Sequence, residues 1–193
     1  LGTYRMSSNK LEDSNTLRYA ISCGINIIDT ASNYGSGTSE LFIGSSLSKL
    51  TRDSVFIVSK AGYIQGYDIG KVKQNNLAHI ELNESFFFSI EPDFVSFQLE
   101  NSLKRLNTEY VDCYLLHNPE YYYEKSTSKA DLKNLLFNSF TLLEQKVKEG
   151  KIRYYGISSN ILSSLPLKDI LDSLAQFPHF KFLQFPYNIV EQN

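Results

Sequence analysis

The chain is poor in cysteine, which excludes a scaffold held together by several disulfides. Its two cysteines, Cys23 and Cys113, show no metal-ligand spacing. Cys23 falls at a predicted helix end and Cys113 inside a predicted strand, so we interpret both as buried, reduced thiols. Reduced thiols predict a cytoplasmic location.

The chain also lacks a large excess of charge of one sign, and it lacks a long apolar run. The 19 Lys and Arg against 21 Asp and Glu leave a net charge of −2, without a basic stripe, so we predict no nucleic-acid partner. No apolar run approaches the ~20 residues of a membrane span, so we predict no membrane partner. No signal peptide is visible, but the chain begins at Leu1 and a leader that has been removed stays open.

Six short apolar runs alternate with five helix-like segments. The predicted strands are Leu1–Met6, Ile25–Asp29, Val55–Lys60, Tyr110–Leu116, Ile152–Ile157 and Phe180–Phe185. The predicted helices are Asp13–Cys23, Ser39–Leu50, Pro92–Leu106, Lys129–Lys148 and Leu167–Gln176. Apolar runs without strict alternation are typical of a parallel sheet covered by helices. A closed α/β barrel typically has ~250 residues, so residues 1–193 predict one domain, an incomplete (β/α)8 TIM barrel of about six parallel strands with outer helices.

One long segment, Ala61–Glu91, interrupts this alternation. It contains three glycines, several asparagines and Phe86–Phe88, and we predict an irregular excursion at the functional rim. Tyr63, Tyr67, Phe86–Phe88 and Tyr121–Tyr123 would either line a substrate pocket or pack loops onto the barrel, and the residue types fit both interpretations.

Polar residues end three of the predicted strands. Asp29, Lys60 and His117 each follow an apolar run, and Tyr34 lies in the glycine- and serine-containing loop just after Asp29. Successive βα units bring strand ends to one rim of a barrel, where the chemistry of such folds takes place. An acid, a phenol, an amine and an imidazole at one rim can form a proton-transfer site.

Each of these residues also has an ordinary explanation. Asp29 could cap a loop, Lys60 could be a solvated strand end, and His117 could be a structural histidine. Tyr34 is one of 13 tyrosines. Asp29 and His117 lack a third metal ligand, and Lys60 would oppose a cation, so we predict no metal. The other histidines, His79 and His179, are predicted at the surface.

The order of motifs resembles the aldo-keto reductase family. GINIIDTASNYG at residues 24–35 is followed by Ser59-Lys60, SLKRL at 102–106, LLHN at 115–118, GISS at 156–159 and Gln184. The likeness extends over residues 1–193. It implies a (β/α)8 barrel, a reduced nicotinamide cofactor (NADPH or NADH) and a small-molecule carbonyl substrate that is reversibly reduced to an alcohol.

The resemblance assigns the catalytic roles to the same four residues. Carbonyl reduction needs a hydride on carbon and a proton on oxygen, and a free tyrosine with a pKa of about 10 is a slow acid near neutrality. We expect Lys60 to lower the pKa of Tyr34, the general acid, and Asp29 to hold the ammonium in place. His117 would orient the carbonyl oxygen and stabilise the charge that develops on it.

The resemblance also implies positions for the cofactor. Thr3 and Tyr4 match a first-strand segment that lies beside it. Ser158, Ser159 and Gln184 match residues that hydrogen-bond the nicotinamide carboxamide. Family members most often have asparagine where this chain has Ser159, with Asn160 next, so either residue would make that contact.

The family's last two strands, which hold the cofactor phosphates, have no counterpart in residues 1–193. Two hypotheses follow: an active NAD(P)H-dependent reductase, or an inactive remnant or binding module whose open barrel edge would favour self-association. The expectation for residues 1–193 alone is little reductase activity, because charge-assisted phosphate contacts dominate dinucleotide affinity. The identity of the substrate and the choice between NADPH and NADH stay open.

Overall fold

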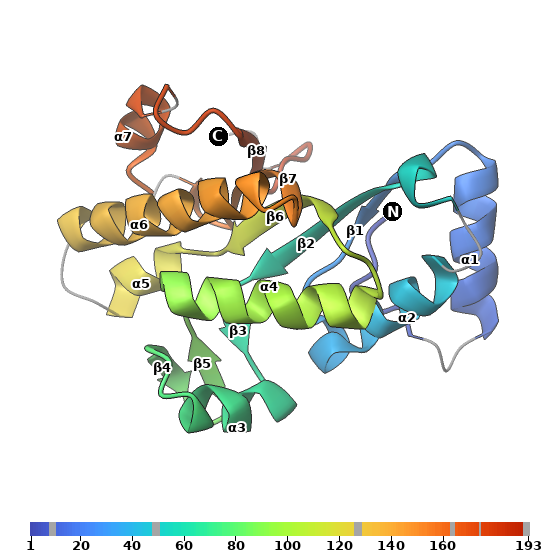
Figure 1. Ribbon diagram of the computed structural model, residues 1–193, viewed down its shortest axis with the longest axis horizontal. Coiled ribbons are helices and arrows are strands. Elements are labelled where there is room, and N and C mark those ends of the chain that lie inside the picture. The colour runs from blue at the N-terminus through green and yellow to red at the C-terminus, as the bar shows by residue number, and fades with distance from the viewer. Residues whose placement is uncertain (8–10, 48–50, 126–128, 163–164, 174, 191–193) are drawn as a thin grey trace.

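The centre of the protein is a parallel five-stranded sheet with the strand order β1-β2-β6-β7-β8 (Figure 1). The computed structural model describes residues 1–7, 11–47, 51–125, 129–162, 165–173 and 175–190. The strands are β1 (Ile27–Asp29), β2 (Phe56–Ala61), β6 (Val111–His117), β7 (Ile152–Ser158) and β8 (Phe180–Gln184). All four neighbouring pairs are parallel and follow chain order, which confirms the predicted α/β fold class.

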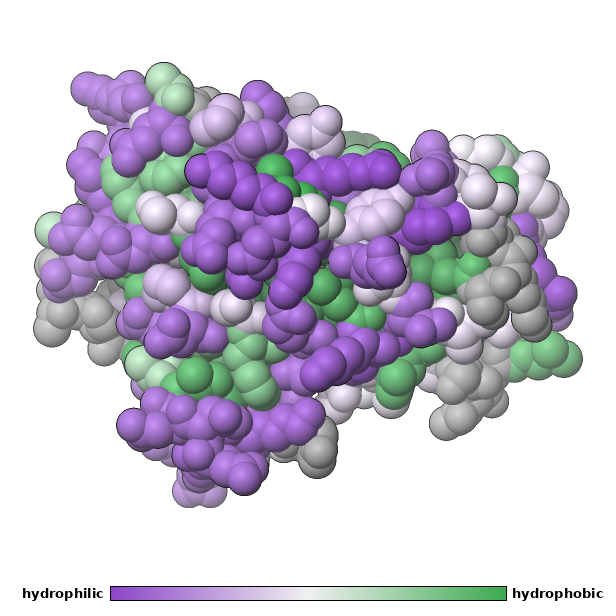
Figure 2. Space-filling model, viewed as in Figure 1, coloured by the Kyte–Doolittle hydropathy of each residue, from purple (hydrophilic) through white to green (hydrophobic). Residues whose placement is uncertain are grey.

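Helices follow the strands in turn and cover the outer face of the sheet. They are α1 (Leu11–Ser22), α2 (Thr38–Leu47), α4 (Pro92–Leu106), α6 (Lys129–Lys148) and α7 (Leu167–Asp172). Their apolar sides pack against the outward residues of the strands in one core that includes Ile57, Tyr114 and Tyr155. The sides of α4 and α6 that face the viewer in Figure 2 are mainly hydrophilic, as amphipathic cover helices require.

The predicted first strand is reduced to a single bridge. Gly2 pairs in parallel with Asp29, through Thr3 N to Asp29 O at 3.0 Å and Asp29 N to Leu1 O at 2.9 Å. The chain then turns at Tyr4 and Arg5, and Met6 N bonds back to Thr3 O at 3.0 Å, so the ladder ends there. The sheet therefore has five strands and a bridged segment in place of six full strands.

The sheet is curved into an arc. Adjacent strands lie about 4.8 Å apart, so a flat sheet would separate β2 from β8 by about 14 Å. Instead the rings of Phe56 on β2 and Phe182 on β8 have centroids 5.7 Å apart. Gln184 at the end of β8 also donates to Asp29 on the far edge at 2.8 Å. The concave side thus holds a small core of its own, built on Val58, Cys113 and Leu115, as the interior of a partial barrel does.

Glycine is required at position 156, where β7 and β8 approach closely. A Cβ at Gly156 would lie 1.8 Å from the carbonyl oxygen of Phe182, its partner on β8. The pairing also shifts register between Tyr155 and Gly156. Only glycine lets the two backbones approach this closely.

The long segment Ala61–Glu91 is ordered, so the prediction of an irregular excursion was wrong. It contains β3 (Tyr63–Ile64), α3 (Tyr67–Gln74), β4 (Ile80–Asn83) and β5 (Phe86–Phe88), and the strands form an antiparallel sheet in the order β3-β5-β4. Ile64, Val72 and Phe87 pack with Phe94 of α4. Strands of two to four residues show too little periodicity to be recognised in sequence.

Smaller differences concern the ends of elements and one thiol. Helix α5 (Glu120–Lys125) lies where no helix was predicted, and α7 ends at Asp172, before the predicted end at Gln176. Residues 48–50 and 174, which two predicted helices include, lie outside the described residues. Cys113 is buried as predicted, but Cys23 is exposed, because α1 ends at Ser22 and the following turn faces solvent. No helix in the described part of the chain is long and apolar enough to cross a bilayer.

Candidate active site

The carboxyl ends of all five strands meet at one rim, and each delivers a polar side chain there. These are Asp29, Lys60, His117, Ser158 and Gln184, from β1, β2, β6, β7 and β8 in turn. Side chains alternate between the two faces of a strand, and these five share the concave face. The prediction that Asp29, Lys60 and His117 lie at one rim is confirmed.

Lys60 is the centre of the site. Its side chain is 1% exposed, and Nζ donates to Asp29 Oδ1 at 2.7 Å, to the Thr30 carbonyl at 2.9 Å and to the Tyr34 hydroxyl at 3.2 Å. An ammonium has three donors, and all three are used. Burial lowers the pKa of Lys60, while the Asp29 carboxylate opposes that shift. The interpretation of Lys60 as a solvated strand end is therefore wrong.

Tyr34 reaches Lys60 from a tight turn after β1. The short helix η1 (Tyr34–Gly37) has positive φ at three successive residues, Gly35 (56°), Ser36 (53°) and Gly37 (93°), which reverse the chain. Burial, followed by the negative charge of Asp29, raises the pKa of Tyr34 to about 12. The expectation that Lys60 lowers this pKa is wrong for the protein alone. Tyr34 stays protonated near neutral pH, which is the state that an acid requires.

His117 is neutral at the same rim. Burial, together with the nearby Lys60 charge, lowers its pKa to about 3. Its ring lies edge-on to Tyr34, with centroids 6.3 Å apart, and to Tyr63, with centroids 4.9 Å apart. A neutral imidazole can donate one hydrogen bond without adding a charge, so His117 can orient a carbonyl oxygen.

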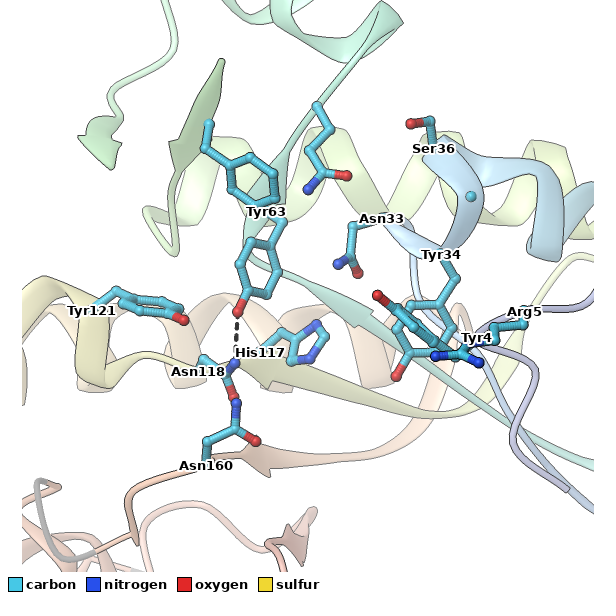
Figure 3. Close-up of a pocket in the computed structure, with 13 residues that line it drawn as sticks. Tyr4, Arg5, Asn33, Tyr34, Ser36, Tyr63, His117, Asn118, Tyr121 and Asn160 are labelled. Carbon is cyan, nitrogen blue, oxygen red and sulfur yellow. Dashed lines mark hydrogen bonds between the residues drawn. The ribbon is translucent and has the colours of Figure 1, made fainter. Parts of the chain in front are cut away.

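A cavity of about 780 Å³ opens over Tyr34 and His117 (Figure 3). Its aromatic wall is made of Tyr4, Tyr34, Tyr63, Phe86 and Tyr121. Phe87 and Phe88 are instead buried in the cores, and the side chain of Tyr67 lies outside the described residues. The aromatic residues named in the sequence analysis are thus divided between the cavity wall and the packed cores.

The residues matched to the cofactor differ in what they can still bind. The Thr3 hydroxyl is fully buried. It donates to Asp29 O at 2.9 Å and accepts from Ser39 Oγ at 2.7 Å, so it is not available to a ligand. Ser159 Oγ accepts from Ile161 N at 3.1 Å. Tyr4, 64% exposed, stands edge-on to Tyr34 with centroids 5.1 Å apart.

Ser158 and Gln184 remain at the rim itself. Gln184 Nε2 donates to Asp29 Oδ2 at 2.8 Å, which leaves its Oε1 to accept from a ligand. Asn160, and not Ser159, lines the cavity. A serine hydroxyl and an amide oxygen are suitable partners for the carboxamide of a nicotinamide, so this donor and acceptor set fits that group. The cofactor contacts themselves stay a prediction.

Sequence reasoning gave no site role to five polar residues of the cavity: Arg5, Asn33, Ser36, Gln65 and Asn118. Asn33 could have been found, because it directly precedes Tyr34. Arg5 and Gln65 carried no such signal. Among the described residues no group of three or more His, Cys, Asp or Glu could hold a metal ion. His79 is exposed as predicted, whereas His179 is half-buried and its Nδ1 lies 2.7 Å from Glu144 Oε2.

Comparisons with known proteins agree with the motif order. The model of the aldo/keto reductase family matches residues 1–193. An NADH-specific methylglyoxal reductase from Escherichia coli is 27% identical over 92% of this chain and 48% of its own length. The methylglyoxal reductase YeaE from the same organism is 30% identical over 82% of this chain and 44% of its own length.

Solved structures give the same result for the fold. An aldo-keto reductase from Klebsiella pneumoniae in complex with NADPH superposes with a TM-score of 0.66 and 26% identity, covering 97% of this chain and 53% of that one. The chain therefore spans about half the length of the relatives that it matches.

Proposed function

Because the chain belongs to the aldo/keto reductase family, we propose that it carries the proton-transfer site of an NAD(P)H-dependent oxidoreductase that reduces an aldehyde or ketone to an alcohol. The observation that carries the proposal is the position of Lys60 Nζ, 2.7 Å from Asp29 Oδ1 and 3.2 Å from the Tyr34 hydroxyl. This arrangement holds a protonated phenol beside a neutral imidazole at the floor of a cavity.

Each residue has a distinct role in the proposed reaction. The nicotinamide, when bound, would supply the hydride to the carbonyl carbon. Tyr34 gives its proton to the carbonyl oxygen, and Lys60 stabilises the phenolate that remains. Asp29 balances the charge of Lys60 in its buried position. His117 donates to the same oxygen and stabilises the negative charge that develops there.

The cofactor is proposed to be NADPH, with NADH as the second choice. The Klebsiella pneumoniae enzyme was solved with NADPH, and one Escherichia coli relative is named NADH-specific. A cytoplasmic location is proposed with it, because Cys23 and Cys113 are both free thiols. Cell fractionation would test the location.

The second candidate, a binding module without turnover, is favoured by the concave face of the sheet. Ile27 is 53% exposed and Tyr154 is 37% exposed there, and β8 pairs only with β7 among the described residues. Such a surface and edge favour association with a second copy or a partner. Sedimentation of the purified protein over a range of concentrations would reveal self-association.

One experiment separates the two candidates. The purified protein is titrated with NADPH and with NADH, and nucleotide oxidation is followed with a panel of aldehydes and ketones. Saturable oxidation that depends on the carbonyl compound supports the reductase. Nucleotide binding without oxidation supports the binding module, and so does the absence of both binding and oxidation.

A further inference from the structure

The loop after β7 contains candidate cofactor residues, and part of its backbone needs an acceptor from outside the sheet. Ser158 ends β7 at the rim, and Asn160 lines the cavity over Tyr34 (Figure 3). On the side of β8, Ser159 N donates to Gln184 O at 2.9 Å. The ladders on both sides of β7 end at Ser158, so the next two N–H groups along the loop need another acceptor.

Glu120 supplies that acceptor. Its Oε1 accepts from Asn160 N at 2.9 Å and from Ile161 N at 3.3 Å, and Ile161 N also lies 3.1 Å from Ser159 Oγ. Glu120 is 2% exposed, and its other oxygen, Oε2, is buried without a partner among the described residues. A buried carboxyl group is costly in free energy, so its position against a loop at the rim calls for an explanation.

The start of α5, where Glu120 lies, is itself fixed to the end of β7. Asn118 has a φ of 54°, which turns the chain away from β6, and its N–H donates to Ser158 O at 2.6 Å. This turn places Glu120 three residues after His117. The Glu120 side chain therefore joins the strand end that carries the imidazole to the loop that carries Asn160.

We propose that Glu120 is a positioning residue for the nicotinamide end of the cofactor: it fixes the loop after β7, so that the side chain of Asn160, close to Ser158, stays in place to bind the carboxamide. This inference rests on the proposed reductase function and adds a residue that touches neither cofactor nor substrate. Oε1 accepts both hydrogen bonds from the loop, so the role depends on where this acceptor lies and not on its charge. A loop presents binding residues reliably when a rigid neighbour holds its backbone.

Three substitutions separate the position of the acceptor from its charge. Glu120→Gln keeps the acceptor oxygen, and its NH₂ replaces an oxygen that makes no hydrogen bond. Glu120→Asp keeps the charge but is shorter, so an oxygen already 3.3 Å from Ile161 N moves out of reach. Glu120→Ala removes the acceptor. In the protein without cofactor, hydrogen exchange at the amides of Asn160 and Ile161 should accelerate by about tenfold or more in the Asp and Ala variants and stay slow in the Gln variant.

The binding test compares NADPH with 2′-phospho-ADP-ribose, the same dinucleotide without its nicotinamide. Both are titrated in a full-length context that includes the family's last two strands. We expect Glu120→Ala and Glu120→Asp to weaken NADPH binding by about three- to tenfold, as the loss of one hydrogen bond does, and to leave binding of the fragment unchanged. Glu120→Gln should bind both as the wild type does. If the wild type prefers NADH, ADP-ribose is the matching fragment.

Glu144→Ala is the matched control at the end of the sheet opposite the rim. The Glu144 side chain is 13% exposed, and it too accepts from a backbone N–H beside a strand, that of His179 at 3.0 Å, together with the Tyr155 hydroxyl at 3.0 Å. Its loss should lower the melting temperature at least as much as Glu120→Ala does. It should not change the ratio of the two affinities, which separates a role at the nicotinamide from a general loss of stability.

The inference is overturned if Glu120→Ala leaves the ratio of the NADPH and fragment affinities unchanged, which would make the carboxylate structural only. It is also overturned if Glu120→Gln behaves as Glu120→Ala and Glu120→Asp as the wild type, which would assign the role to charge. The proposed function fails separately: selective weakening of NADPH binding in Glu120→Ala, without reduction of any carbonyl compound by the wild type, supports the inference and excludes the reductase. A wild-type protein that binds neither nucleotide overturns both.

Discussion

The two ends of the sheet each carry a buried charge, and they differ in what they leave unpaired. At the base, Asp112 is 1% exposed and accepts from Arg52 at 2.7 Å, from Ile57 N at 2.9 Å and from Arg153 at 2.9 Å. The two guanidinium groups lie 4.0 and 4.5 Å from the ring of Tyr110, which itself donates to Asp53 at 2.7 Å. Every charged group of this base network has a partner.

The site at the rim also contains a buried charged side chain, but some of its polar groups have no partner among the described residues. Lys60 is as buried as Asp112, and its Nζ donates hydrogen bonds to Asp29, Thr30 and Tyr34. The Tyr34 proton, however, has no acceptor among the described residues, and the imidazole of His117 has no hydrogen-bond partner there. Saturated pairing at the base favours stability, whereas open donors beside a cavity favour chemistry. Substitutions at the two ends should therefore change different properties.

Tyr34→Phe is expected to have the largest effect, and on turnover alone. In a full-length context that includes the family's last two strands, losing the general acid should reduce turnover by about 10²–10⁴-fold, while NADPH affinity stays nearly unchanged, because the hydroxyl acts as the reaction proceeds. Steady-state kinetics measures turnover, and nucleotide titration measures NADPH affinity. Tyr110→Phe removes the same atom at the base and should leave turnover intact. Equal loss of nucleotide affinity and turnover in Tyr34→Phe would contradict the role.

Asp112→Ala is expected to have the next largest effect, and on stability. It leaves Arg52 and Arg153 without their shared carboxylate and Ile57 N without an acceptor. Because the side chains of Arg52 and Arg153 are 20% and 51% exposed, water can solvate both charges, and the main cost is the buried Ile57 N–H left unpaired, about 1–3 kcal/mol of the free energy of unfolding. Urea denaturation measures it, with Asp112→Asn, which keeps the shape, as the milder comparison. A loss below about 1 kcal/mol would show that the base network is no more than a surface ion pair.

His117 should make stability depend on pH. Its pKa falls from 6.5 to about 3 in the folded protein, so between these values the unfolded chain binds a proton that the folded one does not. The free energy of unfolding should then decrease as pH falls from 6.5 toward about 3, by at most about 1.4 kcal/mol per pH unit. His117→Gln should reduce this slope, and His79→Gln, at an exposed histidine, should not. Identical slopes in both variants would contradict the burial of a neutral imidazole.

The smallest expected effect is that of pH on the rate of reduction. The pKa of Tyr34 is raised to about 12 and that of His117 is lowered to about 3, so neither changes its protonation state between about pH 5 and about pH 9. Turnover with saturating substrate should vary little over that range. A decrease centred near pH 8 that depends on Tyr34 would show that Lys60 lowers the tyrosine pKa once ligands are bound, as the sequence argument expected.

Much of the fold and of the rim could be predicted because short-range patterns encode them. Apolar runs of strand length gave β2, β6 and β7 almost to the residue, and helix α6 matched Lys129–Lys148 at both ends. Polar residues at strand ends gave Asp29, Lys60 and His117, because parallel strands bring their carboxyl ends to one edge. The small antiparallel sheet was not predicted, because a strand as short as Tyr63–Ile64 forms only through its pairing with a neighbouring strand.

The sequence by itself determined the family, the order of strands and the identity of the four residues at the rim. Tertiary structure alone decided the direction in which the pKa of Tyr34 shifts, because burial and the nearby carboxylate of Asp29 both raise it. It also decided that Cys23 is exposed and that the acceptors of Asn33 and Asn118 are left unpaired. Desolvation and hydrogen-bond pairing depend on atoms far apart in the chain, and no local pattern of residues records them.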